Sequence, residues 1–370
     1  MNPTIDAIKE EENILTFTIS NINVSYANAI RRVILSDIPT VVFRTSPYDK
    51  NDATFDINTS RFNNEVLKQR LSCIPIHISD LEMPLEDYIL EVDVNNTSES
   101  FIYVTTADFK IKNKKTDKYL NDSIVKDIFP PNNISKQFID FCRLRPKISD
   151  NLPGEHLKFS CLFSIGTAKE NGSFNVISTC SYKNTPDLIK IEETLLSKES
   201  EMREKYTNDD EYEYAKKDWL LLDAKRIFIP DSFDFTIATI GVFSNITIVK
   251  NAIEIIITRL KKIIEIYSSQ NNLIKPSEST IPNCFDIILE NEDYTIGKIL
   301  EYTLYQIYFI EKETLTYCGF NKPHPHINIS IIRLGFNDIT EYNTIKLYIN
   351  NAATIAIEYY EKLLTLFNEF

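Results

Sequence analysis

The sequence predicts an α+β fold in which two similar strand-and-helix units follow each other in one chain and the first unit carries an inserted, mostly β domain. Three observations predict it. A strand-like run followed by a short amphipathic helix occurs twice, a long amphipathic helix closes each unit, and residues 81–228 lack this repeat. With 370 residues, 43% of them hydrophobic, the chain can bury more than one core.

The two short helices begin directly after the strand-like runs at Leu15 and Phe285. The first is predicted from Asn23 to just before Pro39, with Asn23 or Ser25 as its cap. The second is predicted from Thr295. Apolar residues recur at helical spacing in both: Ala27, Ile30, Val33 and Ile34 in the first, and Ile296, Ile299, Leu300, Leu304 and Ile307 in the second.

The two long helices carry apolar stripes of identical spacing. The stripes are Val249, Ala252, Ile253, Ile256, Leu260, Ile263, Ile264 and Tyr267, and Ala352, Ile355, Ala356, Tyr359, Leu363, Leu366, Phe367 and Phe370. Strand-like runs from Phe243 and Tyr342 introduce them. Matching stripes predict that the helices pack on each other, whereas the alternative is that each covers its own sheet. The predicted helix seam consists of Val249, Ile253, Ile256, Leu260, Ile355, Tyr359, Leu363 and Phe367.

These elements predict four segments. Residues 1–80 and 229–270 form the first unit, 81–228 the inserted domain, 271–282 a polar linker and 283–370 the second unit. The insert is expected to contain two strands around a turn, starting near Gly154, and a charged, solvated helix between Leu196 and Arg226.

Composition argues against several classes of protein. A net charge of -13 disfavours the clustered cations that grip nucleic-acid phosphates, so little or no direct nucleic-acid contact is expected. No apolar run approaches the roughly 20 residues of a membrane span, and the first residues lack a signal pattern. The six scattered cysteines fit a reducing compartment, which predicts a cytoplasmic protein.

The chain offers few residues for catalysis or metal binding. It lacks the common nucleotide-binding and hydrolase motifs, so neither catalytic residues nor a cofactor are predicted. Cys318 with His324 and His326 could share a metal, but a turn leading into a strand explains the same residues, and no metal site is predicted. Arg31 and Arg32 could contact a phosphate or a partner, or form an ordinary solvated pair.

Several stretches resemble the alpha-like subunits of multisubunit DNA-dependent RNA polymerases. The helix from Ala27, ANAIRRVILSDIPT, is similar to the family signature, and segments near Leu144, Gly166 and Asp231 are similar to further family segments. A spaced pattern also matches, carried by Asn58, Thr59, Glu65, Arg70, Leu71, Ile74 and Pro75. This resemblance covers about 1–270 and is to the third-largest subunit type of polymerase II and its D-like archaeal counterpart.

The second half resembles the small partner, the eleventh subunit type of polymerase II and its L-like archaeal counterpart. LENEDYTIGKILEYTL and CGFNKPHPHINISIIRL carry this likeness over 283–370. Together the two likenesses imply a fusion of two alpha-like dimerisation units into an intramolecular pseudo-dimer, as in large cytoplasmic DNA viruses. Ser72, Cys73 and Asn171 depart from the family pattern, and the loop between Thr40 and Asn58 is longer than usual.

The resemblance implies a non-catalytic assembly platform for the two largest polymerase subunits, with small polymerase subunits as further partners. A viral factory or virion is then an expected location. A stand-alone structural or regulatory protein that kept the fold is the alternative, and an enzyme using Cys318 with a His is a third.

The resemblance also assigns roles to single residues. Arg31 and Arg32 would face a catalytic subunit. Glu65 and Arg70 would form an internal pair that fixes the loop, or contact a large subunit. The remaining interface candidates are Asn58, Lys169 and Glu170.

Overall fold

The computed structural model describes residues 2–149, 152–269 and 272–369, and the chain divides into two compact units. Unit 1 contains 1–33, 179–238 and 249–370, and unit 2 contains 34–178 and 239–248. These boundaries differ from the predicted domains, because the chain leaves the first unit within the first helix and the segment 179–238 lies with unit 1.

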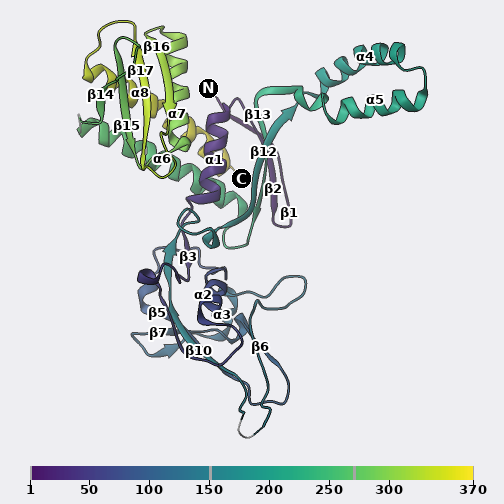
Figure 1. Cartoon of the computed structure of the whole chain (residues 1–370), viewed down its shortest axis with the longest axis vertical. Helices are drawn as coiled ribbons and strands as arrows, with labels where there is room; N and C mark the ends of the chain where they lie inside the picture. The colour runs from purple at the N-terminus through teal and green to yellow at the C-terminus, as the bar shows by residue number, and fades with distance from the viewer. Residues whose placement is uncertain (1, 150–151, 270–271, 370) are drawn as a thin grey trace. The chain divides into compact units, whose positions relative to one another are not determined.

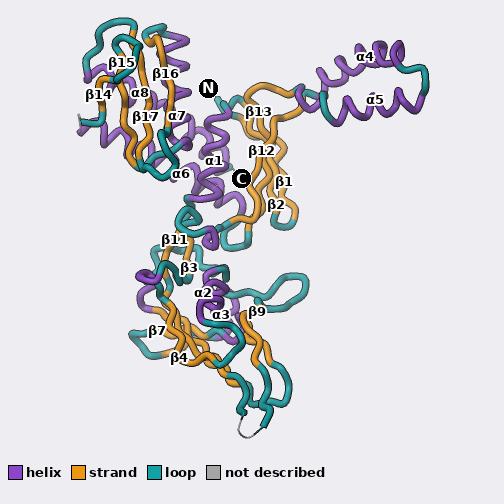
Figure 2. Tube along the Cα trace, in the orientation of Figure 1, coloured by secondary structure: helices purple, strands orange, loops and turns teal. Residues whose placement is uncertain are grey.

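Unit 1 contains two four-stranded sheets with equivalent strand order. The first has the order β1-β2-β13-β12 and the second β14-β15-β17-β16 (Figures 1 and 2). The strands of the first are β1 (Thr4–Glu11), β2 (Ile14–Ser20), β12 (Ile177–Pro186) and β13 (Phe228–Thr239). Those of the second are β14 (Ile274–Pro276), β15 (Cys284–Glu290), β16 (Leu315–Asn321) and β17 (Ile329–Phe336).

Each sheet buries one face under helices, as the alternating pattern predicts. Leu15, Phe17 and Ile19 of β2 are buried, as are Ile287 and Leu289 of β15. A short helix follows each of these strands: α1 (Val24–Ser36) follows β2, and α7 (Tyr294–Leu304) follows β15 and continues as a π-helical segment, Tyr305–Glu311. Both helices lie within two residues of their predicted starts.

The long helices are α6 (Asn245–Ser269) and α8 (Tyr342–Asn368). The strand-like runs expected before them are wrong, because both runs form the first helical turns. β-branched residues favour strands only weakly, and burial overrides that preference. Ile248 in α6 and Ile345 in α8 are completely buried. Phe370, the last position of the second stripe, lies outside the described residues.

The predicted linker is partly structured. Within 272–282, β14 pairs with β15 in antiparallel register, and Leu273 and Ile274 are buried. The polar composition concealed these two apolar side chains, which supply the edge of the second sheet. Residue 271 lies outside the described part of the chain.

The charged segment after β12 forms a hairpin of two helices where one was predicted (Figure 1). These helices are α4 (Leu188–Lys205) and α5 (Asp209–Leu221), followed by a 3-10 turn at Ala224–Arg226. Asn208 breaks the helical run because its side chain accepts a hydrogen bond from the Asp210 amide at 3.1 Å and so caps α5.

Unit 2 is mostly β, as expected for the insert. Its sheets have the orders β4-β10-β5-β7-β8, β11-β3 and β6-β9. The strands are β3 (Thr40–Val42), β4 (Ala53–Asn58), β5 (Tyr88–Asn95), β6 (Ile102–Thr105), β7 (Lys110–Asn113), β8 (Lys118–Tyr119), β9 (Asp140–Leu144), β10 (His156–Leu162) and β11 (Ser164–Gly166). Two helices accompany them, α2 (Asn64–Ser72) and α3 (Asp122–Ile128). Phe109, Phe141 and Phe159 pack together at its centre.

Two further features of the described residues concern membrane-spanning helices and the state of the cysteines. Among the described residues, no helix combines the length and apolar composition that a membrane span requires. All six cysteines are free thiols.

Candidate protein interface

The turns that join β2 to α1 and β15 to α7 share one local design. Asn21 and Asn291 have φ angles of 60° and 58°, in the left-handed region that asparagine tolerates better than most residues. Two residues later, the side chains of Asn23 and Asp293 each accept a hydrogen bond of 2.9 Å from the amide two positions on. The backbone therefore repeats in the two halves of unit 1.

Each of these turns is contacted by a side chain from the other half. The Tyr359 hydroxyl in α8 donates to the Asn21 carbonyl at 2.9 Å. In the opposite direction, Arg32 in α1 donates from Nε to Thr295 Oγ1 at 2.8 Å and from Nη2 to Asp293 Oδ2 at 2.9 Å. These contacts join segments more than 250 residues apart in sequence.

A second arginine holds the α7 turn. Arg259 in α6 pairs with Glu292 through two hydrogen bonds, and the side chains are only 17% and 15% exposed. Burial alone would raise the pKa of the neighbouring Asp293, but hydrogen bonds from Thr295 and the positive charges of Arg32 and Arg259 hold it below its ordinary value. The Asp293 carboxylate therefore stays ionised at neutral pH.

Tyrosines fill the space between α1, α7 and α8. The Tyr26 hydroxyl shares a 2.6 Å hydrogen bond with Thr303 Oγ1, and the Tyr26 ring packs edge-on against Tyr302. The Tyr360 hydroxyl donates to the Tyr26 carbonyl at 3.1 Å. Burial raises the pKa of both Tyr26 and Tyr360, so both hydroxyls remain protonated donors.

The ends of the two long helices reach opposite sheets. The Tyr267 hydroxyl of α6 donates to the Ile288 carbonyl in β15 at 2.5 Å. The Phe367 ring of α8 packs edge-on against Phe17 in β2, with centroids 5.4 Å apart. Lys261 and Glu361 form an ion pair between the helices at 3.8 Å. Each long helix therefore also contacts the sheet of the other half.

Most residues of the predicted helix seam are buried. Those less than 6% exposed are Val249, Ile253, Ile256, Leu260, Tyr359, Leu363 and Phe367. Ile355 is a correction, because 42% of it is exposed and it borders an open pocket next to Tyr302 and Tyr359. Its place in the stripe satisfied the helical period, but the helix presents this position to solvent.

The two adjacent arginines of α1 have different surroundings. Arg32 donates to acceptors of the distant α7 turn and keeps 36% of its side chain exposed, so its contact with a catalytic subunit stays a prediction. Arg31 is half-buried and donates from Nε to Asn28 at 3.0 Å. Burial raises the pKa of the nearby Cys180 thiol to about 12, although the positive charge of Arg31 acts to lower it.

The motif residues in unit 2 mostly stabilise their own loop. The Asn58 side chain donates to the Phe62 carbonyl at 2.8 Å and accepts from the Ser60 amide at 3.0 Å. Arg70 donates to the carbonyls of Asp140 and Phe141 in β9 at 2.7 and 2.8 Å.

The predicted Glu65–Arg70 pair is not formed, because Glu65 pairs with Lys68 at 3.3 Å while Arg70 bonds to backbone. Lys169 is exposed, and Glu170 pairs with Arg44 at 2.6 Å.

A polar groove of about 500 Å³ brings Glu65 near Asn171, directly after Glu170. Its lining is Thr45, Ser46, Glu65, Lys68, Gln69, Ser72, Cys73, Asn171 and Ser173. The Thr45 hydroxyl donates to the Lys68 carbonyl at 3.0 Å and so ties the loop after β3 to α2. Two of the sequence motifs therefore meet at one surface of unit 2.

The residues considered for metal chemistry do not converge on a site. In the part of the chain that the structure describes, no three His, Cys, Asp or Glu side chains are grouped to hold a metal. His324 accepts a hydrogen bond from the His326 amide at 3.1 Å, as a turn requires. Burial raises the pKa of Cys318 to about 12, so this thiol stays protonated.

Sequence reasoning missed the residues that hold the two halves together. No sequence pattern indicated the contact residues Tyr26, Arg259, Glu292, Asp293 and Tyr360. One signal could have found the turns: aligning the two short helices also aligns Asn21 with Asn291 and Asn23 with Asp293.

Comparison with known proteins places the chain among polymerase subunits. A family model described as the RNA polymerase Rpb3/Rpb11 dimerisation domain matches residues 16–260. Human DNA-directed RNA polymerases I and III subunit RPAC1 is 26% identical over 215 residues, covering 52% of this chain and 57% of the human protein. The chain thus spans little more than half of that relative.

Two other relatives match over more of their length. DNA-directed RNA polymerase subunit Rpo3 of Pyrococcus horikoshii is 24% identical, covering 70% of this chain and 96% of the archaeal protein. DNA-directed RNA polymerases IV and V subunit 3B of Arabidopsis thaliana is 22% identical, covering 70% and 90%. With its duplicated strand-and-helix architecture and a family match over most of its length, the chain belongs to the family of the RNA polymerase Rpb3/Rpb11 dimerisation domain.

Proposed function

We propose that this protein is a non-catalytic assembly subunit of a DNA-dependent RNA polymerase, in which two partner subunits are fused and pair within one chain. The observation that carries the proposal is the repeated unit: both sheets have the same strand order, and both strand-to-helix turns have the same backbone and cap. Family membership supports the polymerase context.

Contacts across the two halves support the intramolecular pseudo-dimer. In separate subunits, Tyr26, Arg32 and Arg259 would contact a second protein. Here their partners Thr303, Asp293 and Glu292 belong to the same chain. Fusion makes this association independent of protein concentration, because the linked half is always present at high effective concentration.

Two separate surfaces, one on each unit, are proposed to contact the two largest subunits. Arg31 is half-exposed on α1, and Lys169 is exposed in unit 2. Glu65 is 81% exposed at the side chain and borders the polar groove. Asn58, Arg70 and Glu170 would act indirectly, by fixing the loops that carry these groups.

Composition supports the rest of the proposal. Six free thiols fit a reducing compartment such as the cytoplasm, and a net charge of -13 fits little direct nucleic-acid contact. A viral source, with a viral factory or virion as location, rests on the proposed fusion alone.

Co-expression with the two largest polymerase subunits encoded by the same genome tests the proposal. The tagged chain should recover both in a stable complex, and a Glu65→Lys, Lys169→Glu variant should fold normally but recover less of them. Glu82→Lys with Lys110→Glu, both exposed in unit 2 outside the groove, is the matched control. A well-folded chain that recovers neither subunit would support the stand-alone interaction protein instead.

A further inference from the structure

The α4–α5 hairpin buries very little of its own apolar surface. None of the 18 residues of α4 is buried, and α5 buries only Tyr212 and Trp219. Leu188, Ile189 and Leu196 are 66 to 73% exposed. An isolated helix pair of this length is marginal in water, because most helix stability in proteins comes from packing. The hairpin therefore lacks a packing partner within the described chain.

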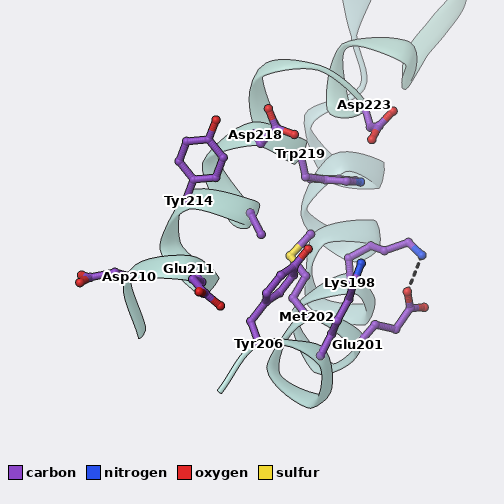
Figure 3. Close-up of a pocket in the computed structure, with 12 residues that line it drawn as sticks. Lys198, Glu201, Met202, Tyr206, Asp210, Glu211, Tyr214, Asp218, Trp219 and Asp223 are labelled. Atoms are coloured by element: carbon purple, nitrogen blue, oxygen red, sulfur yellow. Dashed lines mark hydrogen bonds and ion pairs between the residues drawn. The ribbon is translucent and has the colours of Figure 1, made fainter. Parts of the chain in front are cut away.

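A groove of about 550 Å³ lies between the two helices (Figure 3). Its apolar lining comes from Met202, Tyr206, Tyr214, Ala215 and Trp219. Figure 3 shows the Met202 side chain beside the Tyr206 ring, with the Trp219 indole coming from α5. Thioether and aromatic side chains are adaptable, large contact surfaces that are enriched where proteins bind proteins.

The rim of this groove is predominantly acidic. Five carboxylates line it, Glu201, Asp210, Glu211, Asp218 and Asp223, with only two cations, Lys198 and Lys205. Lys198 is paired with Glu201 at 2.6 Å. An acidic rim repels nucleic acid and anionic lipid, and it attracts cationic side chains, which can also stack on the tyrosine and tryptophan rings.

From this geometry we propose that the groove binds a basic amphipathic helix of another protein. A third helix laid along α4 and α5 would cover the apolar floor with its own apolar stripe and place Lys or Arg against the rim, as in helix-in-groove recognition. This inference does not depend on the polymerase assignment.

The fold allows the hairpin to be removed without disturbing the sheet. It is inserted between the neighbouring strands β12 and β13, and the Asp187 amide donates to the Ile227 carbonyl at 3.3 Å across its base. Replacing residues 188–226 by a two-residue Asn-Gly turn should thus keep the sheet intact. The hairpin also contains the sole tryptophan of the chain, so intrinsic fluorescence reports on this groove.

The experiment titrates the full chain with two synthetic 18-residue peptides that lack tryptophan and share a leucine stripe, one with lysines and one with glutamates at the polar positions. The Leu/Lys peptide should change Trp219 emission saturably, and the Leu/Glu peptide should not. Asp210→Asn, Glu211→Gln, Asp218→Asn should weaken binding roughly 3- to 30-fold, as expected for three rim charges. Glu192→Gln, Glu193→Gln, Glu204→Gln changes the net charge equally on the same hairpin outside the groove and should leave affinity unchanged.

Calorimetry of the hairpin deletion provides the second readout. In a titration, the Leu/Lys peptide should no longer bind. In a thermal scan, the melting temperature should stay near that of the full chain. An equal response to both peptides, equal weakening by the two triple variants, or undiminished binding to the deletion would overturn the proposal. An emission change caused equally by zwitterionic lipid vesicles would assign the groove to a lipid surface instead.

Discussion

The two strand-to-helix turns of unit 1 have the same backbone, but one is uncharged and the other is charged. The turn before α1 is contacted through an uncharged hydrogen bond from Tyr359, whereas the turn before α7 is held by Arg32 and Arg259. Ile22 stands where the second turn has Glu292. A duplicated scaffold has thus kept its geometry while its contacts diverged, which favours pairing of unlike halves over pairing of like halves.

The largest expected effect comes from the buried stripe of the long helices. Ile256→Asp places an unpaired charge at a completely buried position and should lower the free energy of unfolding by about 4 kcal/mol or more. Urea unfolding measures it. Ile355→Asp is the matched control on the other long helix, where 42% exposure predicts a loss below about 2 kcal/mol. Equal losses would show that the two positions are not distinguished by burial.

The charged turn should be most sensitive to Arg259. Arg259→Ala removes the opposite charge and two hydrogen bonds from the mostly buried Glu292 carboxylate, which should cost about 3 kcal/mol of unfolding free energy. A double variant, Arg259→Met with Glu292→Leu, removes both charges and should recover most of this loss. If the double variant is no more stable than the single one, the lost charge compensation at Glu292 is not the cause.

Arg32 should contribute less, because its side chain is 36% exposed. Arg32→Ala should lower the free energy of unfolding by about 1 kcal/mol, since solvent screens the contact with Asp293. Arg31→Ala, which removes only a hydrogen bond to Asn28 within the same helix, should lower it less. Identical unfolding midpoints for wild type and Arg32→Ala would contradict a stabilising role for its internal contacts.

Asp293 should make the charged turn sensitive to acid. Its pKa is lower in the folded chain than the ordinary value near 4, so the unfolded chain binds more protons in that range. Its contribution to stability is therefore complete above about pH 4 and decreases as the pH falls through the folded pKa. Asp293→Asn should show a smaller difference in thermal stability between pH 6 and pH 3 than wild type. An unchanged difference would mean that other carboxylates dominate.

The uncharged turn should show a small effect that does not depend on salt. Tyr359→Phe removes the hydrogen bond to the Asn21 carbonyl and keeps the ring, so a loss of about 1 kcal/mol is expected, independent of salt. The loss of unfolding free energy caused by Arg259→Ala should instead be smaller at high salt than at low salt. Equal salt dependence of the two variants would contradict the electrostatic difference between the turns.

Local patterns in the sequence were sufficient to predict the elements that carry this comparison. The two short helices and the strands before them were predicted within two residues, because alternation and helical periodicity are local signals. Most of the buried stripe of the long helices followed from the same reasoning, but Ile355 is exposed and Ile264 and Leu366 are half-buried. Periodicity identifies a face of a helix but not how far along the helix that face is covered.

Other features depend on residues far apart in sequence. Arg32 and Arg259 have acidic partners 261 and 33 residues away, which no local pattern indicates. The polar composition of the linker hides Leu273 and Ile274, which supply a strand, and the π-helical continuation of α7 follows from no feature of its composition. The domain boundaries also differ from the predicted ones. The hairpin between β12 and β13 belongs to unit 1, like the sheet whose strands it connects, and not to unit 2.

The most direct test of the central claim, that the two halves pair within one chain, is to cut that chain after it has folded. A protease site inserted between Ser269 and Asn272 separates α6 from β14 without removing either. After cleavage, both fragments should elute together as one species in native buffer and separate only in denaturant, because Tyr26, Arg32, Arg259 and the long helices still join them. Fragments that separate in native buffer at micromolar concentration would contradict the claim.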